Sequence, residues 1–120
     1  MTAGSLGAMH RIFRLPFATL YPLYVEKIRR KGRTTEELDE VLGWLTGFDE
    51  AQLDEQRNSG ATLEEFFAAA RLPEGSARIT GVICGMRVEE IEDPLMQKIR
   101  YMDKVVDELA RGKAVEKILR

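Results

Sequence analysis

The apolar stripe that follows Asp93 and Pro94 constrains the fold of this chain more than any other feature. Its side chains recur at intervals of three and four residues, which is the spacing of one face of an α-helix. The stripe consists of Leu95, Ile99, Met102, Val106 and Leu109. Asp93 suits the N-cap, Pro94 suits the first helical position, and Gly112 is placed to end the pattern. The sequence therefore predicts a long helix with one buried face between Asp93 and Gly112.

Capping residues indicate three more helices earlier in the chain. Thr34 precedes Glu37, and Thr62 precedes Glu65, by the three residues of a capping box, which satisfies free N–H groups at a helix start. Asp49 is a third N-cap, and we expect it to open a short, polar surface helix that ends at the next glycine. The apolar residues expected to face the core are Leu38, Val41, Leu42, Leu45, Leu63, Phe66, Phe67 and Ala70.

A first helix is predicted from residue 22 onward. Its apolar residues at helical spacing are Phe17, Leu20, Tyr21, Tyr24, Val25 and Ile28. Pro22 disfavours helical geometry in the residue before it, so we expect a looser turn before a regular helix that begins near Pro22. At the other end of the chain, residues 113–120 predict a final short helix that uses Val115, Ile118 and Leu119.

The segment from Ala77 to Gly85 fits two structures. Ile79, Val82 and Ile83 have helical spacing, but β-branched residues and two glycines also suit a short strand. We predict a short helix over 77–84 with Gly85 as its C-cap, because no second convincing strand is evident. A lone strand would leave its backbone N–H and C=O groups unpaired.

These patterns predict an all-α fold, namely a small single-domain bundle of five or six short helices. The 120 residues suit one domain, which we expect to span residues 10–120 without disulfides or metal. Residues 1–9 lack the basic and apolar regions of a signal peptide, so we expect a disordered tail, native or added for expression.

Composition bears on location and on the class of partner. No apolar run approaches the roughly 20 residues that span a bilayer. The single cysteine favours a reducing compartment, and we expect a cytoplasmic location without membrane partners. The net charge of −2 gives no general attraction to nucleic acid. Five of the seven residues from Lys27 to Arg33 are cationic, but a helix C-terminus explains them, so nucleic-acid binding is not expected.

Cys84 is the residue that most resembles a catalytic group. A cysteine nucleophile needs a base, and His10, the only histidine, lies in the loose N-terminal segment. The flanking Val82 and Ile83 suggest apolar surroundings, so we expect Cys84 to be buried and structural. One cysteine and one histidine cannot make a zinc set, and the acidic runs lack the spacing of a calcium loop. We therefore expect no catalytic residue, no metal and no cofactor.

Charged residues cluster before the last long helix. They are Arg87, Glu89, Glu90, Glu92 and Arg100. Their simplest role is an ion-pair network that holds the loop between Gly85 and Pro94. The alternative is a small polar ligand held by Arg87 and Arg100, with a tyrosine such as Tyr24 and with Cys84 as further contacts.

Long stretches of the chain resemble a known bacterial family. They include "HRIFRLPFATLYPLYVEKI", "KGRTTEELDEVLGWLTGFDE" and "RVEEIEDPLMQKIRYMDK". On these residues the chain resembles the small uncharacterised proteins designated domain of unknown function 2200, from about His10 to Arg120. The resemblance implies a small α-helical domain and brings no established activity, cofactor or site residue.

Two classes of function remain open at the level of sequence. The first is a non-enzymatic interaction or binding module, with a second copy or another protein as partner. Met86, Met96 and Tyr101 are apolar positions that could cover such a partner. The second is a small-molecule binder or enzyme that uses the region of Arg87, Arg100 and Cys84.

Overall fold

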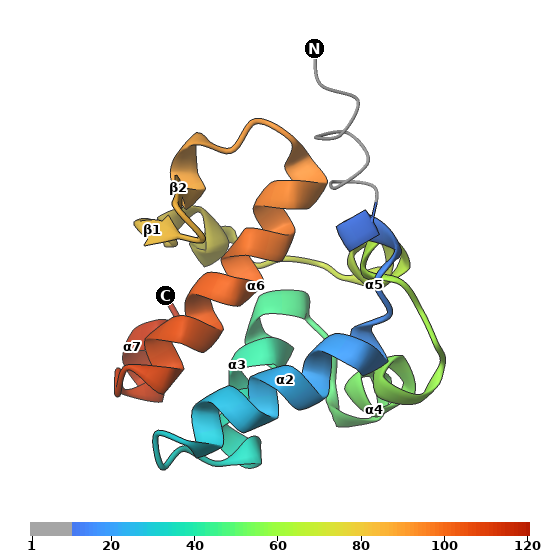
Figure 1. Ribbon diagram of the computed structural model, residues 1–120, viewed down its shortest axis with the longest axis horizontal. Coiled ribbons are helices and arrows are strands. Elements are labelled where there is room, and N and C mark those ends of the chain that lie inside the picture. Colours follow the sequence, from blue (N-terminus) through green and yellow to red (C-terminus); the bar gives the residue numbers. More distant parts are fainter. Residues whose placement is uncertain (1–10) are drawn as a thin grey trace.

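Helix α6 (Pro94–Ala110) is the longest helix of the computed structural model, which describes residues 11–120 (Figure 1). Asp93 Oδ1 accepts a hydrogen bond from the backbone N–H of Met96 at 2.8 Å, and Pro94 stands in the first turn. Four of the five predicted stripe residues are fully buried, namely Ile99, Met102, Val106 and Leu109. The predicted long helix is thus confirmed. The expectations for residues 1–9 and for His10 lie outside the described residues.

Five further α-helices surround α6. They are α2 (Phe17–Arg29), α3 (Thr35–Thr46), α4 (Glu50–Asn58), α5 (Leu63–Ala69) and α7 (Val115–Ile118). Helix α6 packs against α2, α3, α5 and α7, whereas α4 packs against α2 and α3 (Figure 1). Residues 11–14 add one helical turn before α2. The predicted all-α class is confirmed, and no helix within residues 11–120 has both the length and the apolarity needed to cross a bilayer.

The predicted caps form as the sequence indicates. Thr34 Oγ1 accepts a hydrogen bond from the N–H of Glu37 at 3.2 Å, and the Glu37 carboxylate accepts one from the N–H of Thr34 at 3.0 Å. Thr62 and Glu65 repeat this exchange at 3.2 and 2.9 Å, and Asp49 caps α4. A cap of this kind stabilises a helix by about 1 kcal/mol, so local sequence fixes where these three helices begin.

An aromatic cluster joins α2 to α5. The rings of Phe17 and Phe66 stack with their centroids 4.2 Å apart. Phe48 and Phe67 meet Phe66 edge-on, with centroids 5.3 and 5.0 Å away. Burying one such side chain contributes roughly 1.5–3 kcal/mol, which makes the cluster a major part of the core.

Helix α2 begins earlier than predicted. It starts at Phe17 and continues through Pro22, so the prediction of a start near Pro22 was wrong. Pro22 is exposed, and water can therefore solvate the carbonyl that the proline leaves without an N–H partner. Phe17, Tyr24 and Ile28 are buried along the same helix, and their burial favours a continuous helix over a break.

The segment predicted as a helix over 77–84 is a hairpin preceded by a 3₁₀ turn. The turn is η1 (Glu74–Arg78), and the antiparallel strands are β1 (Val82–Ile83) and β2 (Met86–Arg87), followed by η2 (Val88–Glu90). Cys84 and Gly85 form the two-residue connection, with φ of 52° and 77°. Two positive φ values are typical of a type I′ turn, whose twist matches paired strands. The helix prediction was wrong because it missed that the partner strand is formed by the very next residues.

Candidate functional site

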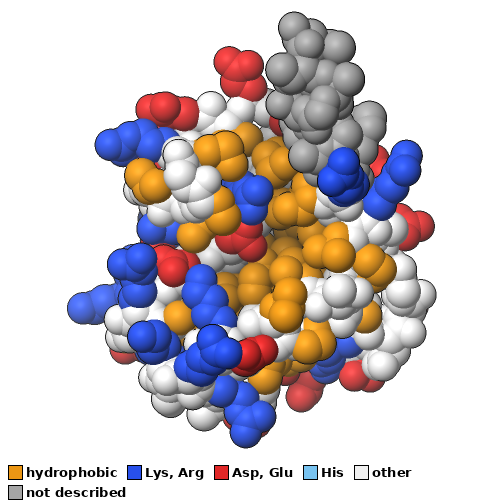
Figure 2. Space-filling model, in the orientation of Figure 1, with side chains coloured by type: hydrophobic (Ala, Val, Ile, Leu, Met, Phe, Trp, Pro, Cys, Tyr) orange, Lys and Arg blue, Asp and Glu red, His pale blue; other side chains and the backbone are white. Residues whose placement is uncertain are grey.

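A groove of about 830 Å³ lies where the hairpin and the following loop meet the start of α6. We call it the hairpin groove, and its lining residues are Ile12, Gly85, Met86, Arg87, Glu90, Ile91, Glu92, Asp93, Met96 and Arg100. Figure 2 shows that apolar side chains gather in a band on the face where α2 and α6 lie in front. The volume is within the range of roughly 300–1,000 Å³ common for binding sites, so the groove is the candidate functional site.

A series of four hydrogen-bonded side chains reaches this groove through Arg100. The Tyr24 hydroxyl of α2 donates to Asp103 Oδ1 at 2.5 Å, and Arg100 Nη1 donates to Asp103 Oδ2 at 2.8 Å. The same Arg100 nitrogen lies 3.5 Å from Cys84 Sγ at the hairpin turn. The structure therefore brings together three of the four predicted contact residues, Tyr24, Arg100 and Cys84, around Asp103.

Asp103, which links Tyr24 to Arg100, was not predicted from the sequence. Asp103 stands three residues after Arg100, and this spacing places both side chains on one face of α6. That spacing could have suggested the ion pair. Nothing in the sequence indicated that Tyr24 is the hydrogen-bond partner of Asp103, because it lies 79 positions away and meets Asp103 only through the packing of α2 on α6.

The Tyr24 hydroxyl acts as a fixed hydrogen-bond donor. Burial, and then the charge of the Asp103 carboxylate, raise the pKa of Tyr24 well above 10.0. The phenol is therefore neutral at physiological pH and gives its proton to the hydrogen bond with Asp103. In this state Tyr24 orients Asp103, and Asp103 in turn orients Arg100.

Cys84 is exposed, so the prediction of a buried, structural cysteine was wrong. The physical reason is the turn. A two-residue connection projects from the end of its strands, and a side chain there cannot pack beneath them. The apolar neighbours that suggested burial are not fully buried either, since Val82 is 53% exposed and Ile83 is only partly buried.

Arg87 lies on β2 and lines the groove, but it does not join the Tyr24–Asp103–Arg100 chain. Its side chain is 58% exposed, and its Nη1 lies 3.6 Å from Glu89 Oε2. Glu90 and Glu92 are exposed and form no ion pair with any residue from 11 to 120. Of the expected ion-pair network around this loop, only the long Arg87–Glu89 pair is present among the described residues. Arg100 instead pairs with Asp103, which lies on the same helix, α6.

The three apolar positions proposed for a partner surface separate into two groups. Met86 is 37% exposed and lines the hairpin groove, and Met96 lines the groove from α6 although little of it is exposed. Tyr101 packs in the core and does not line the groove. Leu23 of α2 is 57% exposed and was not predicted as a surface residue.

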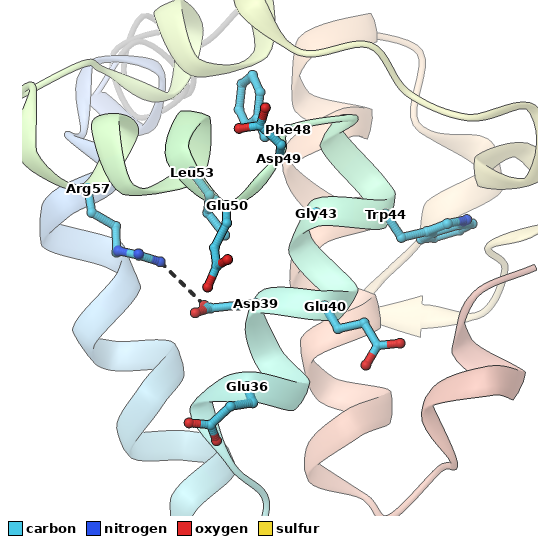
Figure 3. Close-up of a pocket in the computed structure, with 10 residues that line it drawn as sticks. All are labelled: Glu36, Asp39, Glu40, Gly43, Trp44, Phe48, Asp49, Glu50, Leu53 and Arg57. Atoms are coloured by element: carbon cyan, nitrogen blue, oxygen red, sulfur yellow. Dashed lines mark ion pairs between the residues drawn. The ribbon is translucent and has the colours of Figure 1, made fainter.

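A second, smaller hollow of about 340 Å³ lies between α3 and α4 (Figure 3). Acidic residues dominate its lining, which includes Glu36, Asp39, Glu40, Asp49 and Glu50. In Figure 3 the carboxylates of Asp39 and Glu50 point toward the same opening, whereas the ring of Trp44 points away from it. We call this hollow the acidic pocket.

The one cation of the acidic pocket is already used within the protein. Arg57 Nη1 lies 3.4 Å from Asp39 Oδ1, and the guanidinium stacks 5.0 Å above the Tyr21 ring. The Tyr21 hydroxyl donates to Asp39 at 2.6 Å. Burial, and then this hydrogen bond, raise the pKa of Tyr21 from 10.0 to about 12. These contacts fasten α2, α3 and α4 together and leave no cation free for a ligand.

The basic run from Lys27 to Arg33 is largely paired. Lys27 lies 3.2 Å from Asp107, and Arg33 lies 2.8 Å from Glu37 and also donates to two carbonyls. Arg30 pairs with Glu26. Three of the five cations thus hold helix ends in place. Within residues 11–120, no group of three or more His, Cys, Asp or Glu side chains is arranged to hold a metal ion.

Comparisons with known proteins give a family and a fold. The family model DUF2200, described as an uncharacterized protein conserved in bacteria, matches residues 11–120. The crystal structure of uncharacterized protein SP1917 is 39% identical in sequence and has a TM-score of 0.86, covering 91% of this chain and 90% of that one. A search of curated proteins gives no match.

Proposed function

The chain belongs to the DUF2200 family of uncharacterised bacterial proteins, and from that premise we propose that it is a non-enzymatic binding module whose binding surface is the hairpin groove. The observation that carries the proposal is the mixed lining of the groove. Ile12, Ile91 and Met96 supply apolar surface from three separate segments, and Arg100 supplies a cation held in place by Asp103. Apolar walls with a few oriented polar groups are the usual composition of a binding site.

The arrangement favours binding over catalysis. Tyr24 is a neutral donor whose proton is directed at Asp103, so it does not serve as a base. Asp103 in turn accepts from Tyr24 and Arg100 on its two oxygens. Tyr24 and Asp103 are therefore both occupied by the hydrogen bonds that orient Arg100.

Solvent mapping by NMR tests this proposal. Phenol and isobutanol added to ¹⁵N-labelled protein should shift the amide resonances of Gly85, Ile91 and Arg100 more than those of the acidic pocket. Met86→Asp should weaken the shifts, because it places a charge in the groove. Val82→Asp is the matched control, since Val82 is also exposed on the hairpin but does not line the groove. Shifts spread over the surface, or centred on Gly43 in the acidic pocket, would contradict the proposal.

A second candidate function is a small-molecule binder or enzyme that uses Arg87, Arg100 and Cys84. The 3.5 Å approach of Arg100 Nη1 to the exposed Cys84 Sγ favours it, because it brings a nucleophilic sulfur and a cationic hydrogen-bond donor together at the protein surface. This reading predicts that Arg100→Gln slows iodoacetamide alkylation of Cys84 at pH 7. Equal rates in the two proteins, both matching an unstructured cysteine peptide, would exclude it.

We also propose a cytoplasmic location, which the single exposed cysteine supports, since free thiols persist in reducing compartments. Fractionation of cells that express the native gene, followed by immunoblotting, tests it. Recovery in the periplasmic or membrane fraction would contradict the proposal.

A further inference from the structure

We infer that the occupant of the hairpin groove is a second copy of this chain, related by a twofold axis; the inference rests on the proposed binding function. In a twofold interface the same patch serves both partners, so a residue i that contacts j is matched by j contacting i. If such a patch is charged, it requires both signs of charge, because each charge then meets its opposite on the other copy.

The hairpin groove meets this requirement. Its cation at the rim is Arg87, whose only ion pair among residues 11–120 is the 3.6 Å contact with Glu89. Its anions at the rim are Glu90 and Glu92, which are exposed and form no ion pair within the described chain. Within one copy, Arg87 therefore has a single long ion pair, and the two glutamates have none among residues 11–120. A second copy turned by 180° can present its carboxylates to Arg87 and its own Arg87 to the carboxylates.

The apolar part of the surface extends beyond the groove onto α2. Tyr24 and Lys27 of α2 reach Asp103 and Asp107 of α6, at 2.5 and 3.2 Å, so this side of α2 faces α6. Leu23 lies next to Tyr24 and one helical turn before Lys27, which places it on the same side. The hairpin lies along this seam too, because Arg100 contacts Cys84.

The most exposed large apolar side chains of the described residues therefore belong to the hairpin and to this seam. Leu23 is 57% exposed, Val82 53% and Met86 37%. Figure 2 shows apolar side chains in a band on this face, with charged groups around it. A small molecule in the groove would leave Leu23 in water, whereas a second copy can cover it together with the groove.

A charge-exchange experiment tests the inference. Sedimentation equilibrium of the wild-type protein should give twice the 13.6 kDa mass of the chain. Arg87→Glu alone, and Glu90→Lys with Glu92→Lys in another variant, should each weaken self-association at least about tenfold, since like charges then face each other. A mixture of the two variants should recover the wild-type affinity, because the exchanged charges are complementary between the copies.

Two exposed positions outside the groove provide the matched control. Arg29→Glu and Glu55→Lys make the same charge changes on α2 and α4 and should leave the mass unchanged. A wild-type protein that stays monomeric up to about 0.5 mM would overturn the inference. A dimer that ignores the Arg87 and Glu90/Glu92 changes would also overturn it, since another face would form the dimer. Groove shifts with phenol that persist in a monomer would leave the proposed binding function standing.

Discussion

Two Tyr–Asp–Arg sets flank helix α2, and their difference shows how one motif serves two roles. On the side of α3 and α4, Tyr21 donates to Asp39 and Arg57 pairs with Asp39. On the side of α6, Tyr24 donates to Asp103 and Arg100 pairs with Asp103. We call them the α4 triad and the α6 triad. The three residue types and the order of contacts are the same in both.

The two triads differ in what lies beside the arginine. In the α4 triad the guanidinium stacks on the Tyr21 ring, and Asp54 gives it a second carboxylate at 3.2 Å. In the α6 triad the guanidinium borders an open groove and contacts only Asp103 and Cys84 within the described chain. The two arginine side chains are similarly exposed, at 22% for Arg57 and 18% for Arg100. They differ in their partners, because Arg57 is shared by two carboxylates, whereas Arg100 pairs with one carboxylate and lines the hairpin groove.

The largest expected effect comes from removing the central aspartates. Asp103→Ala should destabilise the protein by about 3 kcal/mol, because it leaves the buried Tyr24 hydroxyl and Arg100 without their partner. Asp39→Ala should cost only about 1 kcal/mol, since the Asp39 side chain is nearly twice as exposed, at 31% against 17%. Urea unfolding measures both. Asp54→Ala, at a side chain 64% exposed, is the control and should change little. Equal losses of unfolding free energy for Asp103→Ala and Asp39→Ala would contradict the expected difference between the two triads.

Removing the tyrosine hydroxyls should also destabilise the α6 triad more than the α4 triad, with smaller losses of unfolding free energy than for the aspartates. Tyr24→Phe should cost about 1.5 kcal/mol, because Asp103 then loses a buried donor. Tyr21→Phe should cost about 0.5–1 kcal/mol, since Asp39 keeps Arg57 and is better solvated. Thermal unfolding monitored by circular dichroism compares the two variants. A greater loss of stability for Tyr21→Phe would show that the α4 triad, and not the α6 triad, contributes more to the stability of the protein.

Alkaline pH should weaken both triads. The pKa of Tyr21 rises from 10.0 to about 12 in the folded protein, and that of Tyr24 is raised well above 10.0. Since the folded-state pKa exceeds the unfolded one, the stabilisation is fully present below pH 10 and is lost as the pH rises through the folded pKa. Urea midpoints between pH 9 and 12 should fall for the wild type. The decline should be shallower in the Tyr21→Phe/Tyr24→Phe double variant, and identical slopes would show that other groups cause it.

The smallest effect concerns the hairpin turn beside the α6 triad. Cys84 has φ of 52°, a conformation that asparagine adopts more readily, and Asn-Gly is the favoured type I′ pair. Cys84→Asn should therefore stabilise the protein by about 0.5 kcal/mol. Cys84→Val is the contrasting variant and should destabilise it, because a β-branched residue resists positive φ. Unfolding in urea compares them, and a destabilising Cys84→Asn would indicate that the contact between Arg100 and Cys84 outweighs the turn preference.

Elements with local signals were predictable. Thr34, Thr62 and Asp93 mark helix starts because capping depends on residues within one turn. The stripe of α6 was equally clear, since its period is set by the helix itself. The hairpin was missed because two-residue strands have almost no periodicity, and the start of α2 was misplaced because the burial of Phe17 outweighs the local effect of Pro22.

Part of the candidate site was also predictable. Arg87, Arg100, Cys84 and Tyr24 were named from charge, reactivity and aromatic character, and three of them meet around Asp103. Their roles were not predictable. The exposure of Cys84 depends on a turn that was taken for a helix, and the distance of Arg87 from the triad depends on its strand.

The sequence by itself determined the helices of this protein and the faces that they bury, because caps and apolar periodicity act between residues within a few positions of each other. Only the tertiary structure decided what lies beside the arginine in each of two triads built from the same residue types. That outcome depends on whether α4 or a short hairpin comes to lie beside the arginine, which is a matter of packing between segments far apart in the chain.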